Sequence, residues 1–210
     1  MADGIWGPTL AVMARQPVAG AVKTRLAQRI GAMEALRFYR TVGDELLRRV
    51  QQDKRWRTVL AVTPESALRA GHWPHAIRRI PQGRGDLGAR LQRIFDVLPP
   101  GPAVVVGSDI PNIRAGDISR AFALLGFYDA VFGRAEDGGY WLVGLKRRSK
   151  RSSLFANVRW SSEHALADSV RNLRGARIGY VRTLYDVDTR EDWLRWRQGI
   201  KMTNRSGSSP

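Results

Sequence analysis

Short apolar runs alternate with amphipathic stretches along most of this chain. Runs of strand length lie at residues 9–14, 57–63, 102–108, 128–133, 139–145 and 177–184. Helical spacing of apolar residues occurs at 32–52, 86–98, 116–126 and 162–173, and Thr189 is placed to open a final helix at 192–198. This alternation predicts an α/β fold, with a mostly parallel sheet covered by helices on both faces. In such folds, ligands bind beyond the carboxyl ends of the strands.

Length and composition favour one folded unit. The 210 residues are 43% hydrophobic, which is enough for one substantial core, and we expect a single domain over residues 1–199 followed by a disordered polar tail at 200–210. No apolar run is long enough to span a membrane, and the N-terminus lacks a signal-peptide pattern, so we expect a cytoplasmic protein. The absence of cysteine excludes disulfides and thiolate metal sites.

The chain is strongly basic. Its formal net charge is +16, with 30 arginines against 5 lysines, and the arginines are scattered over most of the expected helices. The densest basic run, KRRSKR at 146–151, contains no aromatic residues of the kind that stack on nucleic-acid bases. We therefore favour a solvated basic surface over a nucleic-acid footprint.

The loop after the first apolar run carries several cations. In ARQPVAGAVKTRLA, the side chains of Arg15, Lys23 and Arg25 surround Gly20, and Lys23 stands at the start of a short helix. Loop amides, helix amides and cationic side chains at a strand end form a common kind of anion site. The alternative is a surface loop with solvated basic side chains. The loop matches neither a Walker pattern nor a GxGxxG fingerprint.

Carboxylates follow two other expected strands. Asp109 in VVVGSDIP ends the most apolar run, and Asp186 and Asp188 in DVDTRED end the last one. At a strand's carboxyl edge such groups can hold Mg²⁺ or Mn²⁺, with phosphate oxygens and water completing the shell. Each aspartate also fits ordinary turn or helix-capping chemistry.

A third acidic stretch is EDGGYWLVGL. Its glycines allow the backbone to approach a ligand closely, and of Tyr140 and Trp141 one ring should face the core while the other can line a pocket. A tight turn with two packed aromatics explains the same residues. The three histidines form no HxxxH pair and no GxSxG motif is present, which argues against a histidine zinc site and a serine nucleophile.

Taken in order, ARQPVAGAVKTRLA, GRGDLGARL, GSDIP, EDGGYWLVGL and DVDTREDW resemble one bacterial transferase family, from about Leu10 to Trp193. That family is described as glycosyltransferases associated with radical-enzyme and selenium-domain gene clusters. It belongs to the nucleotide-diphospho-sugar transferase superfamily, so the resemblance implies a GT-A fold, a three-layer α/β/α sandwich with a mixed sheet. The family pattern has Pro where this chain has Arg134, which would add a cation to the pocket.

The resemblance also assigns roles to residues. It implies that Asp109 and Asp188 bind Mg²⁺ or Mn²⁺, and that Lys23 and Arg25 contact the donor's phosphates and assist catalysis. We take Asp137 as the candidate catalytic base. The remaining candidate nucleotide- or substrate-binding residues are Arg15, Gly20, Gln82, Gly85, Asp86, Gly88, Arg90, Gly138, Gly139, Tyr140 and Trp160.

Two reactions suit these residues. In glycosyl transfer an acceptor attacks the sugar of a nucleotide-diphospho-sugar and a nucleoside diphosphate leaves; in nucleotidylyl transfer a phosphate monoester attacks a nucleoside triphosphate and pyrophosphate leaves. In both, fixed cations stabilise the charge that develops on the departing group. We expect glycosyl transfer to a small-molecule acceptor. The alternatives are nucleotidylyl transfer and a non-catalytic protein that binds nucleotides or polyanions.

Overall fold

The computed structural model describes residues 7–146 and 154–206, without the side chains of residues 200–206. Its strands are β1 (Thr9–Arg15), β2 (Arg57–Thr63), β3 (Arg78–Pro81), β4 (Ala103–Gly107), β5 (Ala130–Ala135), β6 (Tyr140–Leu145) and β7 (Ile178–Leu184). Its helices are α1 (Thr24–Ile30), α2 (Ala32–Gln51), the 3₁₀ helix η1 (Glu65–Arg69), α3 (Leu87–Val97), α4 (Ala115–Leu125), α5 (Ala165–Arg171) and α6 (Arg190–Ser206).

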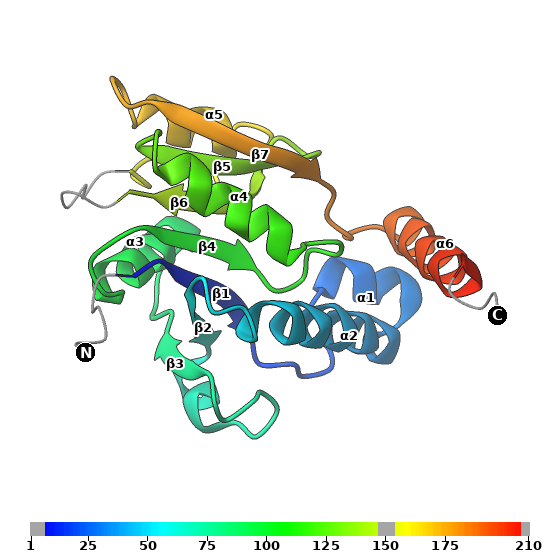
Figure 1. Cartoon of the computed structure of the whole chain (residues 1–210). Coiled ribbons are helices and arrows are strands. Elements are labelled where there is room, and N and C mark those ends of the chain that lie inside the picture. Colours follow the sequence, from blue (N-terminus) through cyan, green and yellow to red (C-terminus); the bar gives the residue numbers. More distant parts are fainter. Residues whose placement is uncertain (1–6, 147–153, 207–210) are drawn as a thin grey trace.

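The strands form one seven-stranded sheet in the order β3-β2-β1-β4-β6-β5-β7. Strand β6 runs antiparallel to both of its neighbours, and the other pairings are parallel. The predicted α/β fold with a mostly parallel mixed sheet is thereby confirmed. The carboxyl ends of β1, β4 and β7 consequently lie along the same edge of the sheet (Figure 1).

Helices cover both faces of this sheet, as predicted. Leu10 and Val12 of β1 pack with residues of α2 and α4 on one face, whereas Ala11 packs with residues of α3 on the other. Strand β1 is buried over most of its length because both of its faces meet helices, and this explains its continuous apolar run. Figure 1 shows α4 on the near face and α3 and α5 behind the sheet.

Helix α6 packs at the end of the molecule beside α1 and α2 (Figure 1). Trp196 meets the Phe38 ring edge to face, with 4.8 Å between the ring centres, and Trp193 packs against the same cluster. The helix begins with a reciprocal cap: Asp192 Oδ2 accepts the Thr189 N–H at 2.9 Å, and Thr189 Oγ1 accepts the Asp192 N–H at 3.2 Å. The expected helix start at Thr189 is correct.

Three sequence expectations need correction. The edge strand β3 and the helix η1 were not predicted, because a four-residue strand that begins with two arginines lacks an apolar run. Helix α5 is shorter than the predicted 162–173. Helix α6 extends to Ser206, so residues 200–206 are not part of a disordered tail; helical hydrogen bonds propagate along a polar stretch once a helix is nucleated. Residues 207–210, and 147–151 of the basic run, lie outside the described residues.

Candidate active site

A pocket of about 610 Å³ opens at the carboxyl edge of the sheet. It is bordered by the loop after β1, the turn after β4 and the segment after β7, together with the start of α3. Eight of the candidate residues line it: Arg15, Lys23, Arg25, Gln82, Arg90, Asp109, Tyr140 and Asp188. Lys23 and Asp188, which are 165 positions apart in the chain, therefore lie in the same pocket.

Lys23 lies at the centre of the charged part of this pocket. Its Nζ atom is 2.9 Å from Asp109 Oδ2 and 3.0 Å from Asp188 Oδ1, and its side chain is only 7% exposed. Burial would lower the pKa of Lys23, but the neighbouring carboxylates, Asp109 first among them, raise it above its ordinary value. The lysine is therefore a fixed cation that holds two carboxylates together.

The backbone of the loop explains how Lys23 reaches this position. Lys23 adopts a left-handed conformation, with φ 45°, and directly precedes α1. Gly20 has φ 76° and allows the turn before it, while Arg15 Nη1 donates to the Ala21 carbonyl at 3.1 Å. Arg25 remains 75% exposed, with Nη1 3.9 Å from Asp188 Oδ2. The three cations of this loop thus lie at the pocket, with Lys23 buried and Arg15 and Arg25 exposed.

Tyr39 of α2 joins the ends of β1 and β4 beneath the charged groups. Its buried hydroxyl accepts the Arg15 N–H at 2.7 Å and lies 3.1 Å from Ser108 Oγ. Burial and the nearby charge of Asp109 raise its pKa to about 12, so the hydroxyl keeps its proton. Sequence reasoning did not select Tyr39, because within a helical pattern a tyrosine gives no sign that it faces a ligand site.

Asp186 is a third pocket carboxylate, and its buried Oδ1 atom has no hydrogen-bond partner. Burial raises the pKa of Asp186 to about 7; Lys23 opposes this shift, and the negative charges of Asp109, Asp137 and Asp188 add to it. An acidic group with a raised pKa in the folded state makes the protein less stable as the pH rises from about 4 to 7.

Asp186→Asn should therefore stabilise the metal-free protein at pH 8 by roughly 2–4 kcal/mol and leave it nearly unchanged at pH 4, because asparagine removes the cost of charging a buried carboxyl group. Urea denaturation in EDTA at the two pH values measures the effect. Asp96→Asn on the exposed face of α3 is the matched control. An equal gain at both pH values would contradict the assignment.

Hydrogen bonds to β1 and β2 and at the start of α3 hold the segment from Gln82 to Arg90. The buried Gln82 side chain donates from Nε2 to the carbonyls of Ala61, at 2.8 Å, and Ala14, at 3.2 Å. Asp86 caps α3 by accepting the Ala89 N–H at 2.8 Å. Gln82 and Arg90 line the pocket, but Gly85, Asp86, Gly88 and Gly20 are not among its lining residues.

Gly88 of α3 packs closely against Trp160 and the backbone of Phe155. A Cβ atom on Gly88 would lie 2.7 Å from the Phe155 carbonyl oxygen and 3.0 Å from Trp160 Nε1. The Trp160 ring also meets Tyr140 edge to face, with 6.2 Å between ring centres. The structure therefore places Trp160 against α3 and not among the pocket-lining residues, although its neighbour Ser161 lines the pocket.

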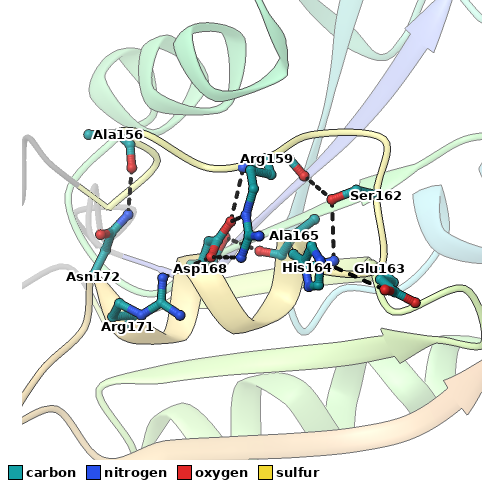
Figure 2. Close-up of polar contacts among 10 residues, drawn as sticks. Ala156, Arg159, Ser162, Glu163, His164, Ala165, Asp168, Arg171 and Asn172 are labelled. Atoms are coloured by element: carbon teal, nitrogen blue, oxygen red, sulfur yellow. Dashed lines mark hydrogen bonds and ion pairs between the residues drawn. The ribbon is translucent and has the colours of Figure 1, made fainter.

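The segment that carries Ser161 is fastened to α5 by polar contacts (Figure 2). Arg159 donates to both carboxylate oxygens of the buried Asp168 at 2.9 Å, and Arg171 adds a second ion pair to it at 3.0 Å. These hydrogen bonds from Arg159 hold the pKa of Asp168 well below its usual range. Asn172 donates to the Ala156 carbonyl at 2.8 Å. These contacts hold the segment that carries the pocket residue Ser161 in place, although the contacting residues themselves do not line the pocket.

The turn of the EDGG motif connects β5 and β6. Asp137 Oδ1 accepts the Gly139 N–H at 2.9 Å, and Gly138 has φ 85°, as expected for a tight connection. The Tyr140 hydroxyl lies 3.2 Å from Ser169 Oγ, and burial raises its pKa. Asp137, Gly138 and Gly139 are not pocket-lining residues, although Asp137 is close enough to raise the pKa of Asp186.

Arg134 does not add a cation to this pocket. Its guanidinium lies 4.1 Å from the centre of the Tyr180 ring on the neighbouring strand β7. Arg134 is exposed, and its side chain stacks on the Tyr180 ring at the surface of the sheet. This contact explains why an arginine is accommodated where the family pattern has proline.

The acidic side chains of the pocket supply only part of the ligand set that a divalent cation needs. Within residues 7–146 and 154–206, no cluster of three or more acidic or histidine side chains is arranged to hold a metal. Asp109 and Asp188 nevertheless converge on one point, now taken by the Lys23 ammonium, and the buried Oδ1 of Asp186 is unpartnered. Mg²⁺ is commonly held by one or two carboxylates plus substrate phosphates, so the residues fit such an ion when a phosphate ligand is also bound.

The fold of this chain matches that of nucleotide-diphospho-sugar transferase neighbours. A protein of Desulfovibrio desulfuricans G20, provisionally named a nucleotide-diphospho-sugar transferase, is 26% identical, with a TM-score of 0.78 over 87% of this chain and 82% of its own. The family model for uncharacterized proteins conserved in bacteria (DUF2064) matches residues 46–162, more than half of the chain. The chain therefore belongs to that family.

More distant structures share the fold alone. The 4-diphosphocytidyl-2C-methyl-D-erythritol synthase of Anaerococcus prevotii DSM 20548 is 10% identical, with a TM-score of 0.60 over 94% of this chain and 99% of its own. Rv0371c of Mycobacterium tuberculosis H37Rv, in complex with manganese, is 18% identical, with a TM-score of 0.54 over 90% and 97% of the two chains. No curated protein is detectably similar in sequence. No helix within the described residues is long and apolar enough to cross a lipid bilayer.

Proposed function

We propose that this protein is a metal-dependent transferase that moves a sugar from a nucleotide-diphospho-sugar to a small-molecule acceptor. The observation that carries the proposal is the meeting of Lys23, Asp109 and Asp188 in one pocket at the carboxyl edge of the sheet. The name of the 26%-identical relative and the manganese bound by Rv0371c support it. Asp109 and Asp188 are the proposed ligands of Mg²⁺ or Mn²⁺.

The cationic side chains are proposed to bind the donor's phosphates. Arg25 and Arg90 line the pocket as an exposed and a half-exposed cation, and the buried Lys23 contacts the carboxylates directly. Cations fixed in place before the reaction stabilise the charge that a leaving diphosphate gains as its bond to the sugar breaks. A divalent ion would supply further neutralisation of the same phosphates when bound.

Asp137 is the proposed base for the acceptor. In an inverting transfer, the acceptor oxygen bonds to the anomeric carbon, the carbon–oxygen bond to the diphosphate breaks, and the hydroxyl proton passes to a carboxylate. The Asp137 side chain stands on the turn beside the pocket, where Oδ1 is engaged by the Gly139 N–H. This orients the carboxylate without neutralising it.

Nucleotidylyl transfer is the second candidate function. The relative from Anaerococcus prevotii, whose name describes a diphosphocytidyl product, supports it. The cations Arg15, Arg25 and Arg90 that line the pocket also suit a triphosphate, because a nucleoside triphosphate carries more negative charge than a nucleotide-diphospho-sugar. In this reaction the acceptor phosphate would attack the α-phosphorus, and pyrophosphate would depart.

One experiment separates the two reactions. The protein is screened by thermal shift against UDP-, GDP- and ADP-sugars and the four nucleoside triphosphates, with and without Mn²⁺, since a ligand that binds the folded state raises the melting temperature. The ligands that stabilise it are then incubated with candidate acceptors. Release of nucleoside diphosphate supports glycosyl transfer, release of pyrophosphate supports nucleotidylyl transfer, and the absence of any Mn²⁺-dependent stabilisation would contradict both.

A further inference from the structure

The position of Lys23 raises a question that the proposed transferase reaction does not answer. Its ammonium contacts both proposed metal ligands, at 2.9 Å from Asp109 and 3.0 Å from Asp188. These are the oxygens that a divalent ion would need. An ammonium group and a divalent ion cannot occupy this point together, since like charges a few ångströms apart repel by several kcal/mol in a partly buried site.

We propose that Lys23 is the resident cation of this site, and that a divalent ion binds by displacing its ammonium from Asp109 and Asp188. The inference rests on the proposed function, because it takes the two aspartates as the metal ligands. Without Lys23 the metal-free protein would hold three pocket carboxylates, including the partly buried Asp186, with no buried cation among them. The lysine thus neutralises the carboxylates in the metal-free protein and at the same time competes with the metal.

The surroundings of Lys23 give the displaced ammonium a destination. Lys23 directly precedes α1, and its neighbours Thr24 and Arg25 also border the pocket. A side chain with four methylene groups that leaves the carboxylates can therefore turn toward the region where donor phosphates are proposed to lie. A bound polyphosphate would attract the ammonium and release the carboxylates, so polyphosphate and metal should each strengthen the binding of the other.

The test uses Mn²⁺ alone as the probe. Free Mn²⁺ gives a six-line EPR signal that is lost on binding, so a titration yields the dissociation constant for the full-length protein. Lys23→Met should bind Mn²⁺ about tenfold or more tightly than the wild type, because the competing charge is gone. Lys23→Gln, which keeps polar contacts without the charge, should change in the same direction and serves if the methionine variant does not fold. Lys54→Met removes an exposed lysine near the start of β2 and should leave Mn²⁺ affinity unchanged.

A second readout follows the lysine itself. Amine acetylation mapped by mass spectrometry should label Lys23 poorly without metal and several-fold more on saturation with Mn²⁺, while labelling of exposed Lys54 stays constant. Equal Mn²⁺ affinity in wild type and both variants, or unchanged Lys23 labelling, would overturn the exchange. Mn²⁺-dependent nucleotide binding in that case would leave the transferase proposal standing. Tighter Mn²⁺ binding by the variants without any nucleotide binding would support the exchange and remove the transferase.

Discussion

Asp109→Asn is expected to abolish the Mn²⁺-dependent rise in melting temperature and to lower turnover by at least about 100-fold. Asparagine keeps the shape of the side chain but removes the charge that attracts a divalent ion and the partner that now holds Lys23 at 2.9 Å. Without the ion that Asp109 is proposed to hold, the positive charge that stabilises the leaving diphosphate is lost, and losing one such interaction typically costs this much in rate. Thermal shift with and without Mn²⁺, followed by product assays with the ligand that stabilises the wild type, measures both effects.

Asp96→Asn is the matched control for this experiment. Asp96 is an exposed residue of α3 whose carboxylate accepts a hydrogen bond from Gln92 within the same helix, and it is not a pocket-lining residue. The substitution is chemically identical, so a general effect of losing one negative charge would appear in both variants. A metal-dependent shift of normal size in Asp109→Asn would show that the ion binds elsewhere.

Gly138→Ala is expected to destabilise the protein by about 3 kcal/mol, the largest stability effect expected in the EDGG motif. The residue has φ 85°, and an added Cβ would collide with the Glu163 backbone, lying 2.6 Å from its Cα atom and closer still to its carbonyl oxygen. Backbone atoms cannot rotate away as a side chain would. Urea denaturation of the metal-free protein gives the free energy of unfolding.

The adjacent glycine provides the comparison. In Gly139→Ala the new Cβ would lie 3.1 Å from Asp137 Oδ1, a movable side-chain atom, and Gly139 lacks the positive φ of Gly138. We expect a loss of less than about 1 kcal/mol. Similar losses in the two variants would contradict the explanation, which makes Gly138 a packing glycine and not a point where the backbone approaches a ligand.

The arrangement of the charged groups could be predicted in outline from the sequence. Apolar runs identified β1, β4 and β7, and the residues that follow parallel strands meet at one edge, so Lys23, Asp109 and Asp188 were expected together. The ion pairs between them could not be predicted. They depend on the left-handed backbone of Lys23, a conformation that a lysine rarely adopts and that no local pattern indicates.

Other parts of the site lay beyond sequence reasoning for similar physical reasons. A glycine such as Gly88 or Gly138 indicates that a side chain is not tolerated, but the sequence does not say whether a ligand or another part of the protein comes close. In both cases the structure places protein atoms there. Tyr39 was missed because its role depends on hydrogen bonds to the ends of two strands.

The high arginine content also gains a physical explanation from individual contacts. Arg79 donates to three backbone carbonyls, those of Leu68, Ala70 and Trp73, and thereby closes the segment between η1 and β3. Arg182 on β7 pairs with Asp117 of α4 at 2.6 Å. These two arginines thus support local structure.

The most direct test of the whole account is to locate manganese in crystals grown with the nucleotide or nucleotide-sugar that stabilises the protein most. The anomalous signal of Mn²⁺ marks the ion without assumptions about the ligand. We expect one peak between Asp109 and Asp188, with the phosphates facing Arg25 and Arg90 and the Lys23 ammonium turned away from the carboxylates toward them. A bound nucleotide whose phosphates lie outside this pocket, or a manganese peak away from both aspartates, would contradict the account.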